Sequence, residues 1–208
     1  MTTLVAPDWK LVEEYLRQGR TIIGIDEVGR GAWAGPVVAG AVILNPQLSL
    51  PGVNDSKLVR AKARRTLDRD IRMSASHIGL GWVAPDELDE HGLSWAIAES
   101  GRRALEAMPT DNTVIILDGS WNYLKDSHEA ITIVKADSLV LPVAAASLVA
   151  KVARDRYMET ISKLLPGYGF ERHVGYGTKQ HQEALQSLGP SAAHRCSYTP
   201  VGATRMDV

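Results

Sequence analysis

The 208-residue chain has one cysteine, no apolar run long enough to span a membrane, and almost no net charge (formally −1 at pH 7). The single thiol of Cys196 cannot form a disulfide within the chain, and one cysteine with scattered histidines argues against a structural zinc site. The first ten residues lack the basic stretch and apolar core of a secretory signal. We therefore expect a cytoplasmic protein that does not associate with a membrane.

Charge is distributed unevenly along the chain. Residues 57–72 contain seven Lys or Arg and two Asp, and the segment from residue 151 onward contains eight Lys or Arg and five acids. Basic surfaces around an acidic centre suit a metal-dependent nuclease. A charged helix over 57–72 is equally compatible with a solvated face.

Hydrophobic patterning predicts an α/β fold in which five strands form a mixed sheet flanked by helices. The first two strands are close enough in sequence to form a hairpin. The catalytic part is expected over 1–165 and a C-terminal helical and loop extension over 166–208, packed as one compact unit. Strands are predicted at 21–25, 36–44, 76–83, 113–117 and 130–134, and helices at 56–73, 85–108, 143–165 and 178–188.

Acidic residues recur where predicted strands end. Asp26 and Glu27 follow the first strand, Asp118 follows the fourth, and Asp137 lies just past the fifth. Four carboxylates at one edge of a sheet repel each other unless cations bind there, and oxygen ligands are what Mg²⁺ and Mn²⁺ accept. Two such ions are a known solution for phosphodiester cleavage. The pattern therefore predicts a metal site.

Two observations keep a simpler explanation open for these acids. Neighbouring residues on a regular strand point to opposite faces, so Asp26 and Glu27 can share a metal only if the strand bends or ends there. An Asp-Gly pair such as Asp118-Gly119 is commonly just a turn.

A Gly-Arg-Gly turn follows the first acidic pair. Gly29 and Gly31 leave backbone N–H groups open to a phosphate, and Arg30 adds a guanidinium group. The stretch also matches the G-x-G-x-x-A dinucleotide-binding pattern, but that pattern must open a helix, whereas Gly35-Pro36 and a β-branched run follow here.

Three further features have both a structural and a functional interpretation. Tyr176 stands between two glycines and is either a half-buried turn residue or an aromatic ring presented for stacking on a sugar or base. Ser147, Lys151 and Arg154 share one helix face, which is either a functional surface or the polar rim of a core helix. The six histidines show no metal-ligand spacing, and most are expected at the surface.

Taken together, these residues make the chain similar to bacterial ribonuclease HII, the type 2 ribonuclease H. The resemblance extends over almost the whole chain, and the DEVGRG and GYGT elements are the most specific to the family. The matching segments include DEVGRG (26–31), NDSK (54–57), LDG (117–119), KADS (135–138), AAASLVAKVARDRYM (144–158), GYGT (175–178) and GPSAAHRCSYTPV (189–201).

The resemblance implies a ribonuclease H-like fold and cleavage of RNA in RNA–DNA hybrids, including cleavage on the 5′ side of a single ribonucleotide in duplex DNA. It implies two Mg²⁺ or Mn²⁺ ions and nucleic-acid substrates. No obligate protein partner is evident from the sequence, and we expect a monomer. The matching positions are Asp26, Glu27, Asp118 and Asp137 for metal binding and catalysis, Gly29, Arg30 and Gly31 for the ribose 2′-hydroxyl and adjoining backbone, Tyr176 for stacking at the RNA–DNA junction, and Lys57, Ser147, Lys151 and Arg154 for phosphate contacts or support.

Two rival functions remain at this point. Another nuclease of the same fold would not need the tyrosine of the GYGT element. A non-catalytic nucleic-acid-binding module would keep its affinity for hybrids after loss of all four acids and would show no turnover with any metal. Trp33 occupies a loop position that is often smaller in relatives, and we expect it to affect packing rather than catalysis.

Overall fold

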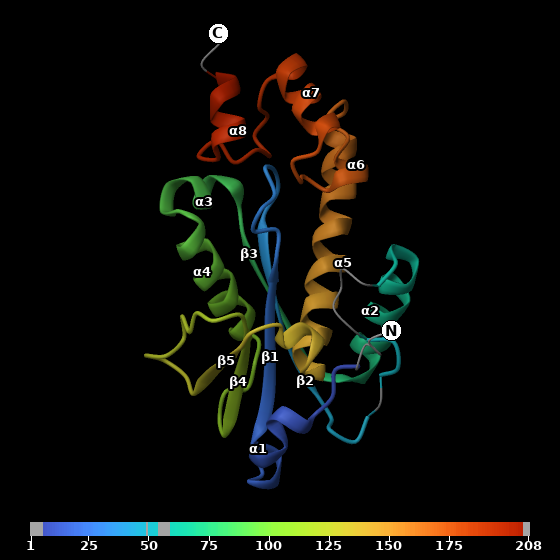
Figure 1. The fold of residues 1–208 in the computed structure, drawn as a ribbon, viewed down its shortest axis with the longest axis vertical. Coiled ribbons are helices and arrows are strands. Elements are labelled where there is room, and N and C mark those ends of the chain that lie inside the picture. Colours follow the sequence, from blue (N-terminus) through green and yellow to red (C-terminus); the bar gives the residue numbers. More distant parts are fainter. Residues whose placement is uncertain (1–5, 49, 54–58, 206–208) are drawn as a thin grey trace.

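The computed structural model describes residues 6–48, 50–53 and 59–205 and contains one mixed five-stranded sheet (Figure 1). The strand order is β3-β2-β1-β4-β5, with β1 antiparallel to β2 and parallel to β4. The predicted hairpin and the five predicted strands are confirmed. The strands are β1 (Thr21–Val28), β2 (Val37–Leu44), β3 (Ala75–Val83), β4 (Thr113–Asp118) and β5 (Ala130–Ile133).

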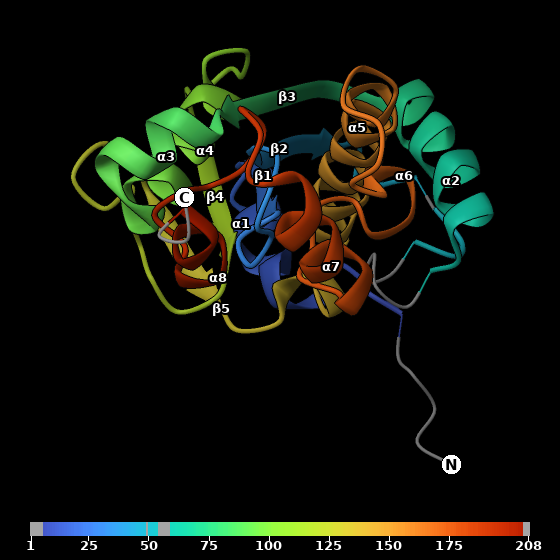
Figure 2. The same ribbon diagram turned by 90° about the horizontal axis from the view of Figure 1, so that it is seen from above.

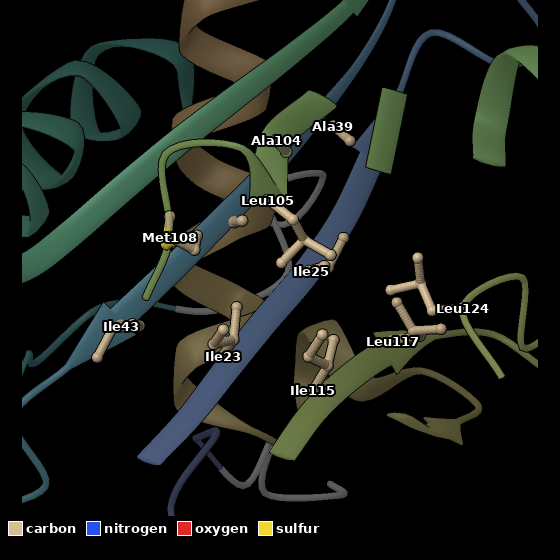
Figure 3. Close-up of a cluster of buried hydrophobic side chains, with 11 residues drawn as sticks. Ile23, Ile25, Ala39, Ile43, Ala104, Leu105, Met108, Ile115, Leu117 and Leu124 are labelled. Carbon is tan, nitrogen blue, oxygen red and sulfur yellow. The ribbon is translucent and has the colours of Figure 1, made fainter. Parts of the chain in front are cut away.

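One face of the sheet packs against α4 (Leu93–Leu105). Ile23 and Ile25 of β1 point to this side and form a buried cluster with Leu105 and with Leu117 of β4 (Figure 3). Alternation along a strand brings every second residue to one face, which is why the odd-numbered residues of β1 share this core.

The other face is covered by α5 (Leu141–Leu164), a 24-residue helix. Ile22 packs here with Val143, and a Cβ on Gly24 would fall on the backbone of Pro142. The absence of a side chain at Gly24 therefore lets the start of α5 lie directly against β1. This contact holds the first turns of α5 beside the end of the strand.

The helices differ from the sequence prediction in several places, and the short helices over 10–17 and 136–138 were not predicted. The helix predicted over 85–108 is two helices, because Gly92 has a φ of +85° and ends α3 before α4 begins. The predicted start at Ser56 lies outside the described residues, and α2 begins at Ala61. A short helix, α6, interrupts the predicted irregular segment, and α8 with the short helix η3 replaces the predicted C-terminal loop. The remaining helices are η1 (Lys10–Val12), α1 (Glu13–Arg17), α2 (Ala61–Ser74), α3 (Pro85–His91), η2 (Ala136–Ser138), α6 (Phe170–His173), α7 (Lys179–Leu188), α8 (Thr199–Gly202) and η3 (Ala203–Arg205).

The C-terminal elements α7 and α8 gather at one end of the molecule with α6 beside the end of α5, whereas α1 lies at the opposite end (Figure 1). Seen from above, α8 lies on the side of α3, and α6 and α7 lie on the side of α5 (Figure 2). None of the described helices combines the length and apolar character required to cross a lipid bilayer.

Candidate active site

A cavity of about 380 Å³ opens where β1 ends beneath the C-terminal elements. Its walls come from the end of β1, the turn that follows, the tip of β4, one face of α5 and the segment after α6. Ten residues line it: Asp26, Glu27, Val28, Gly29, Arg30, Gly31, Asp118, Ser147, Lys151 and Tyr176.

Asp26 and Glu27 lie within β1, not after it as the sequence predicted, because the pairing with β2 continues to Val28. The parallel pairing with β4 ends earlier, at Ile25, so this side of β1 is open beside the two acids. Both carboxylates therefore border one cavity, although strand alternation turns their side chains apart. Asp26 is buried and is hydrogen-bonded to Ser147 of α5.

Burial and neighbouring negative charge disfavour ionisation of this pair. Burial raises the pKa of Asp26 well above its usual range, and the charges of Glu27, Asp118 and Asp137 raise it further. Burial also raises the pKa of Glu27, although Arg30 opposes the shift through an ion pair of 3.1 Å. The four acids are thus close enough for their charges to act on one another.

Asp118 and Asp137 are contributed by β4 and by the short helix η2. Asp118 is the last residue of β4 and accepts a hydrogen bond of 2.7 Å from the backbone N–H of Ala136. Asp137 follows in η2 and is buried. Ile25 and Leu117, which directly precede Asp26 and Asp118, are fixed in the core beneath the site (Figure 3). The sheet and η2 together place the acids.

This donor set fits a hard divalent cation. Its ligand atoms are carboxylate oxygens, and a cation would relieve the burial and repulsion that raise the pKa of Asp26. Within the described residues, no three Asp, Glu, His or Cys side chains are close enough to hold a metal as they stand. Asp26, Glu27, Asp118 and Asp137 are the side chains here that could contribute oxygen ligands to such a cation, and the first three of them line the cavity.

The recognition turn, residues 29–31, forms the next part of the wall. Gly29 has a φ of +94°, and a Cβ there would fall on the Arg154 side chain and the carbonyl of Pro36, so the fold itself requires glycine. Gly31 differs, because nothing lies within 4 Å of its Cβ position. Its small size leaves space that an external molecule can approach.

Arg154 supports this turn from below. The guanidinium group is fully buried and donates three hydrogen bonds of 2.9–3.0 Å, to the carbonyl oxygens of Pro36, Val174 and Ala34. Burial lowers the pKa of Arg154 to about 10. Its donors are thus occupied by the backbone, so it holds the loop rather than facing the cavity.

Tyr176 lines the same cavity, and its backbone forms a bridge with Ala32, directly after the recognition turn. Its ring is partly exposed, with the Arg154 guanidinium carbon 5.4 Å and Lys151 Nζ 5.8 Å from the ring centroid. Its backbone N–H donates to the carbonyl of His173 at 2.9 Å. The ring has the exposure and the cationic surroundings that stacking on a nucleic acid requires.

Comparison with known proteins places this geometry in a family. The family model described as Ribonuclease HII matches residues 23–201. A ribonuclease HII of Thermus thermophilus is 43% identical over 198 residues, which cover 95% of this chain and 92% of that protein. The chain belongs to the ribonuclease HII family.

Two solved structures with low sequence identity share the fold. Ribonuclease H2 from Pyrococcus horikoshii OT3 superposes with a TM-score of 0.76 at 24% identity, covering 89% of this chain and 97% of that one. Bst-RNase HIII, solved with Mn²⁺, gives a TM-score of 0.70 at 18% identity and covers 90% of this chain and 70% of that one. The fold is therefore that of type 2 ribonucleases H.

Three histidines of the chain are buried, contrary to the surface position expected from the sequence. His181 Nδ1 lies 3.0 Å from the carbonyl of Tyr176, and the Nε2 atoms of His181 and His194 lie 3.0 Å apart. His194 Nδ1 accepts from the backbone N–H of Ser191 at 2.9 Å. Because a carbonyl only accepts, His181 carries its hydrogen on Nδ1 and His194 carries its hydrogen on Nε2. Two neutral rings thus link Ser191 to the backbone of Tyr176.

Burial lowers the pKa of both His181 and His194 to about 4. His173, the third buried histidine, stacks on His181 with ring centroids 4.5 Å apart. The sequence signal for this cluster was weak, because the three residues come from separate segments and have no regular spacing. Trp33 packs against this cluster, with its ring centroid 5.4 Å from that of His181. Its indole fills the space beside Gly177, which confirms a packing role.

Three residues of the predicted site remain: two line the cavity and one lies outside the described residues. Ser147 lies beneath the acids and lines the cavity. Lys151 also lines it, with Nζ 2.7 Å from Asp155 Oδ1, and burial lowers the pKa of Lys151. Lys57 lies outside the described residues.

Proposed function

We propose that this chain is a metal-dependent endoribonuclease that hydrolyses RNA in RNA–DNA hybrids and cuts on the 5′ side of a single ribonucleotide in duplex DNA. Membership of the ribonuclease HII family supports the activity on hybrids. The observation that carries the proposal is one cavity bordered by three acids, a glycine-rich turn and an exposed tyrosine.

The acids supply the charge that the chemistry requires. Asp26, Glu27, Asp118 and Asp137 would hold two Mg²⁺ or Mn²⁺ ions, which when bound activate a water and stabilise the leaving oxygen. Water adds to phosphorus and the bond to the 3′ oxygen breaks, which leaves a 3′-hydroxyl and a 5′-phosphate. No histidine lines the cavity, so a histidine general base is not part of the proposal.

Recognition is assigned to the recognition turn and to Tyr176, which line the same cavity as the acids. The 2′-hydroxyl distinguishes RNA from DNA, and the backbone of the recognition turn can approach it because Gly31 has no side chain and open space around it. Tyr176 stacks at the junction between the ribonucleotide and the following DNA. Lys151 lines the same cavity, with Nζ 5.8 Å from the ring centroid of Tyr176, and is assigned to contact a phosphate of the substrate.

Cleavage of a labelled duplex with one ribonucleotide tests the proposal. The assay compares Mg²⁺, Mn²⁺ and a chelator, with an all-DNA duplex and a long RNA–DNA hybrid as parallel substrates. A metal-dependent cut on the 5′ side of the ribonucleotide, with the all-DNA duplex intact, is the expected result.

Other outcomes would select one of the rivals. Cleavage of the long hybrid alone would retain the metal chemistry and remove junction recognition, as in another nuclease of this fold. Binding without cleavage in any metal would overturn the catalytic assignment in favour of a binding module.

A further inference from the structure

The carbonyl oxygen of Arg30, in the middle of the recognition turn, is held by two side chains that are distant in sequence. Arg195 Nη1 donates to it at 3.0 Å and the hydroxyl of Tyr198 donates to it at 2.6 Å. The same Arg195 nitrogen lies 3.1 Å from the Tyr198 hydroxyl. Three groups therefore form one closed set of hydrogen bonds around a single carbonyl.

These two donors belong to a short segment, residues 193–198, which we call the C-terminal brace. Its backbone pairs with the chain after the recognition turn: Gly35 N–H donates to Ala193 at 2.8 Å, and Arg195 N–H donates to Trp33 at 2.8 Å. Arg195 Nε also donates to the carbonyl of Gly35 at 2.9 Å. The brace thus runs along the loop and fixes where the Arg195 side chain lies.

The far end of the brace is itself anchored. The carboxylate of Asp89 in α3 accepts from the backbone N–H of Cys196 at 2.6 Å and from that of Ser197 at 3.0 Å. Tyr198 follows directly, with the Arg195 guanidinium 5.3 Å from its ring centroid. Both donors to Arg30 are therefore held by contacts outside the recognition turn.

The burial of Arg195 is unusual for a charged side chain. The side chain is fully buried, yet it makes no ion pair within the described part of the chain. A buried cation without a carboxylate is costly unless its donors are used. Here Nε and Nη1 are used, whereas Nη2 has no partner among the described residues. Two of the hydrogen bonds it makes go to carbonyl oxygens of the recognition turn and its continuation.

Peptide geometry links the Arg30 carbonyl to the cavity. The described peptide bonds are all trans, so the N–H of Gly31 points opposite to the carbonyl of Arg30. Gly31 lines the cavity, whereas Arg195 and Tyr198 do not. No acceptor for the Gly31 N–H exists among the described residues. Holding the carbonyl on the side of the brace leaves this N–H directed away from the brace.

We propose that Arg195 and Tyr198 are positioning residues that orient the Arg30–Gly31 peptide, so that the Gly31 N–H is presented to the cavity as a fixed hydrogen-bond donor for an oxygen of the bound nucleic acid. The inference rests on the proposed function for the identity of that ligand. A donor oriented before binding needs no reorganisation when the substrate arrives.

Tyr198→Phe tests this arrangement because it removes one donor to Arg30 and keeps the ring. The matched control is Tyr168→Phe, which removes a hydroxyl that donates to the carbonyl of Gly189 at 2.8 Å, in the same C-terminal region but away from the recognition turn. On the single-ribonucleotide duplex we expect Tyr198→Phe to lower kcat/KM roughly tenfold, since small displacements of positioned groups are costly. Tyr168→Phe should stay within about twofold.

Amide NMR on the free protein gives a readout that a general loss of stability does not move. In Tyr198→Phe the Gly31 amide should shift and become more mobile, while the amide of Gly177 in the tyrosine loop should not change. Arg195→Lys, which keeps the charge and loses the paired donors, should affect Gly31 in the same way if it folds.

An unchanged Gly31 amide, or equal kinetic losses in Tyr198→Phe and Tyr168→Phe, would overturn the proposal. The NMR measurement requires no substrate. If the unmodified protein failed to cut the ribonucleotide duplex, the proposed function would fail, while the amide data would still decide whether Arg195 and Tyr198 orient this peptide.

Discussion

The acidic wall (Asp26, Glu27, Asp118 and Asp137) and the C-terminal region opposite it, from α6 to the C-terminal brace, differ in how their polar groups are satisfied. In the wall, burial and like charges raise the pKa of Asp26 well above its usual range. In the C-terminal region, Arg195 donates to carbonyl oxygens, and His181 and His194 are buried as neutral rings. The wall is incomplete without cations, whereas these groups of the C-terminal region are satisfied within the protein, apart from Arg195 Nη2, which has no hydrogen-bond partner among the described residues.

This difference separates chemistry from recognition. A site that stores repulsion gains most when a cation binds, and so concentrates the metal where the phosphate must be attacked. A region that directs several hydrogen bonds at one loop holds that loop in place before substrate arrives. Substitutions should therefore be able to impair the acidic wall and the C-terminal region separately.

Asp118→Asn should produce the largest effect, because it removes a metal ligand and keeps the side-chain shape. We expect cleavage to fall by about 1,000-fold or more, since a bound metal contributes several kcal/mol. Affinity for the ribonucleotide duplex should remain, because the amide oxygen can still accept from the N–H of Ala136. Single-turnover cleavage and a binding titration measure the two quantities. Retained cleavage would remove Asp118 from the site.

Gly29→Ala and Gly31→Ala compare a glycine required by the fold with one exposed to the ligand. Gly29→Ala should destabilise the protein by roughly 1–3 kcal/mol, because its positive φ and the contact with Arg154 exclude a side chain. Gly31→Ala should change stability by no more than about 0.5 kcal/mol, since its surroundings are open.

Substrate affinity should distinguish the same two variants in the opposite order, with the larger loss in Gly31→Ala. The methyl group of Gly31→Ala occupies space at the cavity wall, so a well-folded protein with weakened binding is expected. Thermal denaturation and a binding titration on both variants check this. A Gly31→Ala variant that binds as tightly as the unmodified protein would contradict close approach of substrate to this turn.

Local patterns predicted most of the sheet and the position of the acids. Five strands could be predicted because β-branched runs are bounded by turn residues, and the acids stood out because they interrupt apolar segments. The break at Gly92 was missed because helical spacing continues across it, although a glycine after His91 is a common end of a helix.

The C-terminal region was predicted less well because its structure depends on distant contacts. His181 and His194 have no apolar spacing that would indicate burial, and they become core residues only when Trp33 and Phe170 pack on them. Arg195 carries the same difficulty, since an arginine in a loop is ordinarily exposed. Sequence similarity marked this segment as matching the family without indicating what its residues do.

Tyr176→Ala should have a smaller effect that depends on the substrate. Loss of stacking on one base or sugar should cost roughly 1–3 kcal/mol on duplexes with a single ribonucleotide. Long hybrids, in which few cleavage sites lie at a junction, should lose less. The ratio of kcat/KM between the two substrates measures the effect, and equal losses would contradict a junction-reading role.

Stability as a function of pH gives the most direct comparison of the two regions. His181 and His194 have a pKa of about 4 when folded, against an ordinary value of 6.5, so the unfolded chain binds more protons between these limits. Their contribution is present above pH 6.5 and is lost as pH falls toward 4, by up to about 1.4 kcal/mol per pH unit for each ring. The acidic wall acts in the opposite direction, because the raised pKa of Asp26 makes the folded state bind more protons as pH rises above 4.

Between pH 4 and 6.5, thermal denaturation should therefore show that stability rises only shallowly with pH when no divalent ion is present. With Mg²⁺ the rise should be steeper, because the bound ion removes the free-energy cost of ionising the carboxylates of the acidic wall. His194→Gln should reduce the rise in both conditions, whereas His77→Gln, at an exposed position on β3, should leave it unchanged. An identical slope with and without Mg²⁺ would show that the acids are not under strain. A slope unaffected by His194→Gln would mean that the histidine pair does not resist protonation, and the proposed contrast between the two regions would then fail on the C-terminal side.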